Sequence, residues 1–132
     1  MDGEKKGFGM WKWPDGSIYE GNWDDNQIAG FGVYIWPDNR VYQGEYLRSK
    51  MEGFGHYKYP DGTEYIGFYV RDKRQGFGVY KKAGGGTYSG SWLNHKKHGF
   101  GVSNTAGGKQ KFGLYNQGVK IRSFTAEEAN KI

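Results

Sequence analysis

The sequence predicts an all-β fold: an elongated, twisted, single-layer ribbon of five 23-residue β-hairpin repeats, followed by a short C-terminal helix. Three observations support this prediction. A Gly-Phe-Gly tripeptide occurs five times at a constant interval of 23 residues, which indicates a repeat protein. A second glycine, flanked by aromatic residues, recurs at the same period. Turn-forming residues separate the two aromatic segments of each of the first three repeats.

The first strand of each hairpin is expected to begin at the tripeptide, and the second to surround the second glycine. The tripeptides begin at Gly7, Gly30, Gly53, Gly76 and Gly99. The second glycines are Gly21, Gly44, Gly67, Gly90 and Gly113. Two residues before them stand Tyr19, Tyr42, Tyr65, Tyr88 and, as the exception, Lys111; two residues after them stand Trp23, Tyr46, Tyr69, Trp92 and Tyr115. This alternation is typical of strands, and we expect these aromatic rows to form the core.

Pro-Asp-Gly or Pro-Asp-Asn follows the first strand at residues 14–16, 37–39 and 60–62. Proline fixes φ, aspartate bonds its own backbone, and glycine or asparagine accepts positive φ, so we expect a turn at each. Two strands in each of five repeats predict ten strands. Because the second glycines share a face with large rings, a larger side chain at Gly44 or Gly67 is expected to collide with the stacked aromatics.

The repeat period also divides the chain. Residues 1–6 are expected to be a flexible N-terminus, residues 7–118 the repeat array, and residues 119–132 a C-terminal cap. Thr125 and Glu128 have the spacing of a capping box, which predicts a short helix over residues 126–132. Phe124 or Ile132 is expected to cover the end of the last hairpin.

The combined pattern, G-F-G-x-aromatic-x-x-P-D-G-x-x-Y-x-G-x-aromatic, resembles the MORN (membrane occupation and recognition nexus) repeat over residues 7–118. The resemblance implies a non-enzymatic scaffold or structural subunit that binds partner proteins in a larger assembly of the cilium, flagellum or cytoskeleton type. It also implies two alternatives: a module that binds anionic phospholipids such as phosphoinositides, or a regulatory repeat array of a kinase or methyltransferase. A cytoplasmic location is expected, at the cytoskeleton, in a cilium or at the membrane periphery.

Composition argues against several other functions. The chain has no cysteine, and therefore no disulfide or thiol chemistry. No apolar run is long enough to span a bilayer, and Met1 to Lys6 lacks the apolar region of a secretory signal. His95 and His98 lie close in sequence without a third ligand in phase. We therefore expect no catalytic residues, no metal and no cofactor, and nucleic acid is not an expected partner because no motif for it is present.

Charge is distributed unevenly along the chain. Residues 1–66 contain 7 Lys and Arg against 11 Asp and Glu, a net of −4, whereas residues 67–132 contain 12 against 3, a net of +9. Several cations recur at the repeat period and are expected to form a ridge along one edge: Arg48, Lys50, Arg71, Lys73, Arg74, Lys96 and Lys97. Such a ridge could bind an anionic lipid or an acidic partner, or it could protect the sheet edge from pairing with other sheets.

A further row of aromatic residues stands just before the turns. It consists of Trp13, Trp36 and Tyr59. Two residues before this position, on the same face, each of the first four repeats carries another ring: Trp11, Tyr34, Tyr57 and Tyr80. Rings on an open groove are a common surface for protein recognition. The sequence leaves open whether these rings bind a partner or belong to the core.

Overall fold

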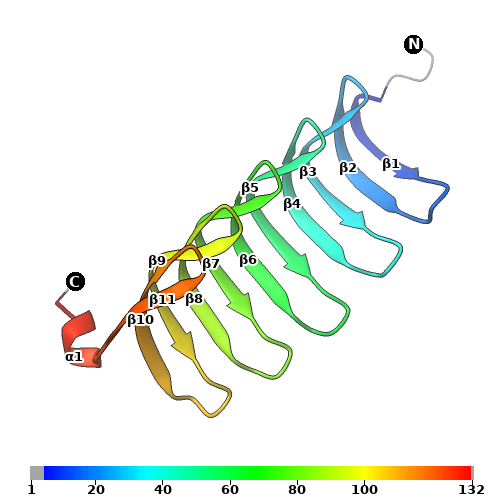
Figure 1. The fold of residues 1–132 in the computed structure, drawn as a ribbon. Coiled ribbons are helices and arrows are strands. Elements are labelled where there is room, and N and C mark those ends of the chain that lie inside the picture. The colour runs from blue at the N-terminus through cyan, green and yellow to red at the C-terminus, as the bar shows by residue number, and fades with distance from the viewer. Residues whose placement is uncertain (1–4, 132) are drawn as a thin grey trace.

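A computed structural model describes residues 5–131 as one open antiparallel sheet in which eleven strands follow one another in sequence order. The sheet forms a long, curved ribbon, with β1 and β11 at opposite ends (Figure 1). The strands are β1 (Gly7–Lys12), β2 (Ile18–Asp24), β3 (Gln27–Ile35), β4 (Val41–Leu47), β5 (Lys50–Lys58), β6 (Glu64–Val70), β7 (Lys73–Lys81), β8 (Thr87–Leu93), β9 (Lys96–Asn104), β10 (Gln110–Asn116) and β11 (Val119–Phe124). The predicted all-β ribbon of hairpin repeats is confirmed.

The predicted Pro-Asp-Gly turns are confirmed at one end of the strands. In the first, the amide of Gly16 donates to the carbonyl of Trp13 at 3.0 Å, and Trp13 donates to the carbonyl of Ser17 at 2.9 Å. The Asp15 carboxylate accepts a hydrogen bond from the Ser17 amide at 2.9 Å. Gly16 has a φ of +99°, a conformation that costs glycine little. The fourth repeat keeps this geometry without proline or aspartate, since Gly85 still donates to the carbonyl of Lys82 at 3.0 Å.

The other end of the strands differs from the prediction. The repeats are joined by two-residue hairpin turns, and the strands that follow these turns begin three residues before the Gly-Phe-Gly tripeptide, not at it as predicted. Both residues of each turn have positive φ, as in Arg48 (49°) and Ser49 (62°). This is the pattern of type I′ turns, whose twist matches that of the strands they join. Each turn is also tied to the previous repeat, as where the Ser49 amide donates to the carbonyl of Ile28 at 2.9 Å.

One face of the sheet, here called the aromatic face, carries the predicted core. Tyr19, Tyr42, Tyr65 and Tyr88 are almost completely buried. Each ring meets the aromatic residue four positions later edge to face, and the equivalent ring of the next repeat in the same way. For Tyr42 these neighbours are Tyr46, at a centroid distance of 5.1 Å, and Tyr69, at 5.5 Å. The core is therefore a continuous chain of T-shaped aromatic pairs, a favourable geometry for such rings.

Glycines permit this packing. Gly44 and Gly55 face each other on neighbouring strands, and the Tyr42 side chain crosses this pair to donate a hydrogen bond to the carbonyl of Glu45 at 3.1 Å. A Cβ at Gly44 would lie 2.6 Å from the Cα of Gly55 and 2.8 Å from the Tyr42 hydroxyl. The predicted collision is confirmed, and the structure adds that the facing backbone is part of it.

The C-terminal region contains an eleventh strand, so the prediction of ten strands was wrong. Residues 119–124, predicted only as part of the cap, form β11, because another two-residue turn at Gln117 and Gly118 returns the chain onto β10. Phe124 packs against Phe100 with ring centroids 5.9 Å apart. The capping box between Thr125 and Glu128 is confirmed.

The helix is shorter than predicted. α1 covers Ala126–Ala129 of the expected 126–132. Residue 132, which was one of the two residues expected to cover the end of the last hairpin, lies outside the described residues. So do residues 1–4 of the expected flexible N-terminus. Within the described part, the Lys5 amide donates to the Asn26 side chain at 2.6 Å.

Candidate functional site

Five of the predicted groove aromatics form a continuous row on the aromatic face. We call this row the aromatic ladder: Trp13, Tyr34, Trp36, Tyr57 and Tyr59. Consecutive ring centroids are 5.5, 4.5, 5.3 and 4.7 Å apart. The spacing arises because the residue before each turn packs beside the first-strand aromatic of the next repeat. The ladder thus crosses the first three repeats as one surface.

The ladder is partly core and partly surface. Tyr57 is buried, whereas Trp13, Tyr34, Trp36 and Tyr59 are half-buried and pack against the core from outside. The inner edges of these rings therefore support the core tyrosines, as the core interpretation expects, while their outer edges remain accessible. A partner could contact the accessible edges without any rearrangement of the sheet.

Two predicted groove residues lie outside the ladder. Trp11 is 44% exposed, and the ammonium of Lys5 lies 4.0 Å from its ring centroid. Tyr80 lies beside Trp92 at a centroid distance of 6.2 Å. The ladder ends at Tyr59 because, among the described residues, no ring contact joins Tyr59 to Tyr80. After Tyr80, Lys82 occupies the position that Tyr59 holds one repeat earlier.

Arg40 holds the middle of the ladder in place through three contacts. The guanidinium of Arg40 lies 4.9 Å from the Trp36 ring centroid, donates to the Tyr57 hydroxyl at 2.9 Å and pairs with Asp38 at 2.8 Å. Burial raises the pKa of Tyr57, while the Arg40 charge opposes the shift. The hydrogen bonds of Arg40 to the Pro-Asp-Asn turn and to a neighbouring strand hold the Trp36 ring between fixed partners.

The predicted basic ridge is divided by the sheet. Arg48 and Arg71 lie in the two-residue turns, while Lys50, Lys73 and Lys96 begin strands β5, β7 and β9 with exposed side chains. Arg48, Lys50 and Arg71 line one shallow hollow together with Leu47 and Glu52. Because successive side chains of a strand point to opposite faces, the cations that follow Lys73 and Lys96 lie on the aromatic face.

Those two cations, Arg74 and Lys97, cover core rings. The Arg74 guanidinium lies 4.6 Å from the Trp92 ring centroid, and the Lys97 ammonium lies 4.6 Å from that of Tyr88. The equivalent positions in earlier repeats hold Ile28 and Met51. The sequence showed this change from apolar to basic at a 23-residue interval, but placing these cations over the rings required the tertiary structure.

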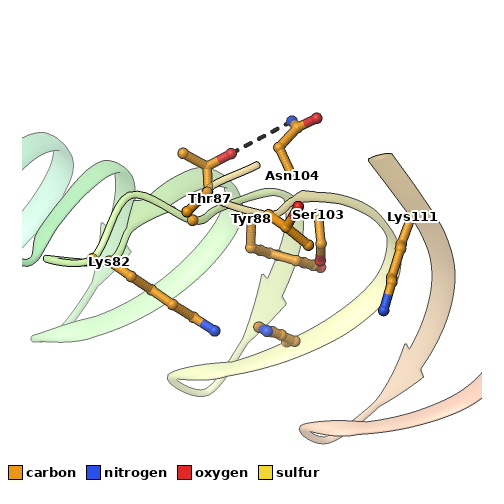
Figure 2. A pocket seen from close by; sticks show the side chains of 11 residues that line it. Lys82, Thr87, Tyr88, Ser103, Asn104 and Lys111 are labelled. Atoms are coloured by element: carbon orange, nitrogen blue, oxygen red, sulfur yellow. Dashed lines mark hydrogen bonds between the residues drawn. The ribbon is translucent and has the colours of Figure 1, made fainter. Parts of the chain in front are cut away.

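The loss of aromatics in the last repeats leaves a hollow of about 470 Å³ on the aromatic face. Its lining includes Lys82, Lys97 and Lys111 beside Tyr88 and Ser103. Figure 2 shows Lys82 and Lys111 extending toward it from opposite sides. In the sequence, Lys82, Ser103 and Lys111 all depart from the repeat pattern, but the sequence analysis did not identify them as members of one site.

The opposite face of the sheet, here called the phenylalanine face, carries an exposed apolar row. It consists of the middle residues of the tripeptides, of which the first four are exposed and the last is half-buried: Phe8, Phe31, Phe54, Phe77 and Phe100. Phe8 is 72% exposed and Phe31 62%. Sequence reasoning used these residues as repeat markers and missed them as a surface. Their alternation with the core glycines was the signal that could have revealed it.

The histidines have structural neighbours. His56 pairs with Glu64 at 2.5 Å, and the Nδ1 atoms of His95 and His98 accept hydrogen bonds from the amides of Arg74 and Gln117. Within residues 5–131, no group of three or more His, Cys, Asp or Glu side chains could hold a metal ion. Over the same residues, no helix is both long and apolar enough to cross a membrane.

Comparison with known proteins identifies the repeat. The MORN repeat family matches residues 1–18, 19–39, 42–64, 65–87 and 88–106. No curated protein matches the sequence significantly. The matches share the 23-residue period but are offset from the Gly-Phe-Gly hairpins. The second to fifth matches begin at Tyr19, Tyr42, Tyr65 and Tyr88, so each covers the second strand of one repeat and the first strand of the next. The chain therefore belongs to the MORN repeat family.

Proposed function

We propose that this protein is a non-enzymatic scaffold that binds a segment of a partner protein along its aromatic face. The observation that carries the proposal is the aromatic ladder, whose half-buried rings run without interruption across three repeats. Large rigid rings contribute much contact area at a low entropic cost, and Trp and Tyr are enriched among the residues that dominate binding energy. The ladder presents such rings already held in place by the core.

Charge suggests the chemistry of the partner segment. Residues 73–126 contain ten Lys and Arg and no Asp or Glu. The end of the sheet formed by β7 to β11 therefore carries cations without an internal acid, among them Arg74 and Lys97 on the aromatic face, while the ladder end of that face is aromatic. A segment that is apolar at one end and acidic at the other would match both surfaces, and the basic field would steer its approach.

The cellular setting is part of the proposal. A subunit built almost wholly of binding repeats suits a cytoplasmic assembly of the cilium, flagellum or cytoskeleton type, as the family resemblance implies. Fractionation of the native cell tests this setting. Recovery in the detergent-resistant pool supports it, and recovery in the soluble pool alone contradicts it.

The binding proposal is tested by cross-linking and affinity capture from native extract with a matched pair of variants. Trp36→Lys introduces the residue that the fourth repeat carries at the equivalent position, Lys82. Phe31→Lys makes the same chemical change on the phenylalanine face. We expect the first variant to lose the partner and the second to keep it. Retention of all partners by Trp36→Lys would refute the ladder as the binding surface.

A second candidate function is recruitment to anionic membranes. The acid-free, basic segment of residues 73–126 favours it, together with exposed side chains on the phenylalanine face such as Phe77. Binding to vesicles that contain phosphoinositides should then weaken steeply with salt. Lys73→Glu combined with Lys96→Glu should abolish it. Salt-insensitive binding to neutral vesicles would contradict this function.

A further inference from the structure

The hollow on the aromatic face exists because the repeat pattern is broken there at three positions. Lys82 stands where Trp13, Trp36 and Tyr59 stand in earlier repeats, Ser103 where Tyr34, Tyr57 and Tyr80 stand, and Lys111 where Tyr19, Tyr42, Tyr65 and Tyr88 stand. Each substitution replaces a ring by a smaller or more flexible side chain. Together they leave about 470 Å³ of space beside Tyr88, at the position where the ladder would otherwise continue.

The three lysines that line this hollow are not neutralised. No carboxylate is among its lining residues, and no ion pair joins Lys82, Lys97 or Lys111 to an acidic side chain within the described part of the chain. The nearest acidic residues in sequence are Asp72 and Glu127. The hollow therefore concentrates positive charge without an internal counter-charge.

Lys97 is the lysine of this hollow on which burial and neighbouring positive charges act most clearly. Its ammonium lies 4.6 Å from the Tyr88 ring centroid and 5.3 Å from that of Tyr115. Partial burial, followed by the charges of Lys82 and Lys120, lowers the pKa of Lys97. An anion between these ammonium groups would reverse the electrostatic contribution, since an opposite charge nearby favours the charged form of lysine.

We propose that this lysine hollow binds a phosphate monoester, carried as a phosphorylated side chain by the partner segment that lies on the aromatic face. Three ammonium groups match a dianion better than the single charge of a carboxylate, and a phosphate supplies three strong acceptor oxygens. Charge-assisted hydrogen bonds of this kind are stronger than neutral ones. The hydroxyl of Ser103, at the wall of the hollow, is available as a further donor.

A protein-borne phosphate is favoured over a lipid headgroup by the position of the hollow. It lies on the aromatic face, in phase with the ladder, so a segment that covers Trp36 and Tyr59 reaches Lys82 one repeat later. The assignment of the phosphate to a partner protein rests on the proposed function. The chemistry of the hollow can nevertheless be tested without the partner.

The test is titration of the full chain with soluble probes, followed by amide NMR shifts of Gly86 and Ser103. The probes are N-acetyl-phosphoserine amide and N-acetyl-aspartate amide, and a third arm uses phosphatidylcholine vesicles with and without phosphatidic acid. We expect saturable binding of the phosphoserine probe at these amides. The aspartate probe should bind about tenfold more weakly, because it carries one charge and fewer acceptors.

The pocket variant combines Lys82→Tyr and Ser103→Tyr, which restore rings that earlier repeats carry, with Lys111→Ser, because a tyrosine at 111 would need a second glycine where Ser123 faces Gly113. The matched control combines Lys73→Ser and Lys81→Ser, which removes the same number of positive charges at exposed sites outside the hollow. The pocket variant should weaken phosphoserine binding by about tenfold or more. The control should change it by less than about twofold, because exposed charges are screened.

Four outcomes would overturn the inference. Equal losses in the pocket variant and the control would mean diffuse attraction by the basic half. Equal affinity for the aspartate probe would refute phosphate selectivity, and binding only to phosphatidic acid vesicles would assign the hollow to membranes. No saturable binding would remove the site altogether. If phosphoserine binds and Trp36→Lys still retains every partner, the proposed function fails while the phosphate site stands.

Discussion

Replacement of Gly55 by alanine tests the physical basis of the aromatic core. The new Cβ would lie well under 3.0 Å from the hydroxyl and two ring carbons of Tyr42, a side chain that is completely buried. To make room, Tyr42 must leave its edge-to-face contacts and its hydrogen bond to the Glu45 carbonyl. Overpacking costs about 1–3 kcal/mol and the hydrogen bond about 1 kcal/mol, whereas the lower backbone entropy of alanine in the unfolded chain returns about 0.4–1 kcal/mol. We expect a net loss of roughly 1–4 kcal/mol in the free energy of unfolding.

Gly9 supplies the matched control. It holds the same position in the first repeat, where no preceding tyrosine crosses it, and a Cβ there would meet only the Trp23 ring, at 3.7 Å. Gly9→Ala should therefore change stability by less than about 0.5 kcal/mol, with an entropic gain as the main effect. Urea unfolding monitored by circular dichroism and tryptophan fluorescence measures both variants, and agreement of the two probes checks that the repeats unfold together. If Gly55→Ala costs no more than Gly9→Ala, the tyrosine–glycine contact does not limit the core.

Three further predictions concern single groups. Burial raises the pKa of Tyr19, Tyr65 and Tyr88 to about 12 from the ordinary 10, so their contribution to stability is complete below pH 10 and is lost as the pH rises through 10 to 12; tyrosinate absorbance should increase together with the loss of circular dichroism, and ionisation of all tyrosines in the folded chain would contradict this. Hydrogen bonds from Thr63 lower the pKa of Asp61, so the stability that this carboxylate contributes is present above pH 3.8 and lost as the pH falls below that value. Asp61→Ala should therefore lower the free energy of unfolding at pH 7. It should also make that free energy depend less on pH in the acid range. Lys97→Met places the Met51 side chain of an earlier repeat over Tyr88 and removes a partly buried, unpaired charge; the urea midpoint should rise, and an unchanged or lower midpoint would show that the ammonium–ring contact outweighs desolvation.

Much of the fold follows from local pattern in the sequence. Hairpin repeats place each contact within one period or between neighbours, so the in-phase residues from Gly7 to Tyr115 specify the strands, the Pro-Asp-Gly turns and the buried tyrosine row. The capping box at Thr125 and Glu128 is equally local. The eleventh strand was missed because β11 carries no tripeptide and no second glycine, so no period marks it. Its pairing depends on the turn at Gln117 and Gly118, whose positive φ values only the backbone shows.

The candidate sites depend more on tertiary structure. The sequence by itself determined which residues recur, and hence that Trp13, Trp36 and Tyr59 share a face. Only the fold decided that the basic ridge divides, because the two-residue turns begin the strands three residues earlier and thereby send Lys96 and Lys97 to opposite faces. Only the fold also joined Lys82, Lys97 and Lys111 in one hollow. These lysines lie in different strands and turns. The hollow forms where rings of the repeat pattern are missing, and the space that they leave can be recognised only once neighbouring repeats are packed together.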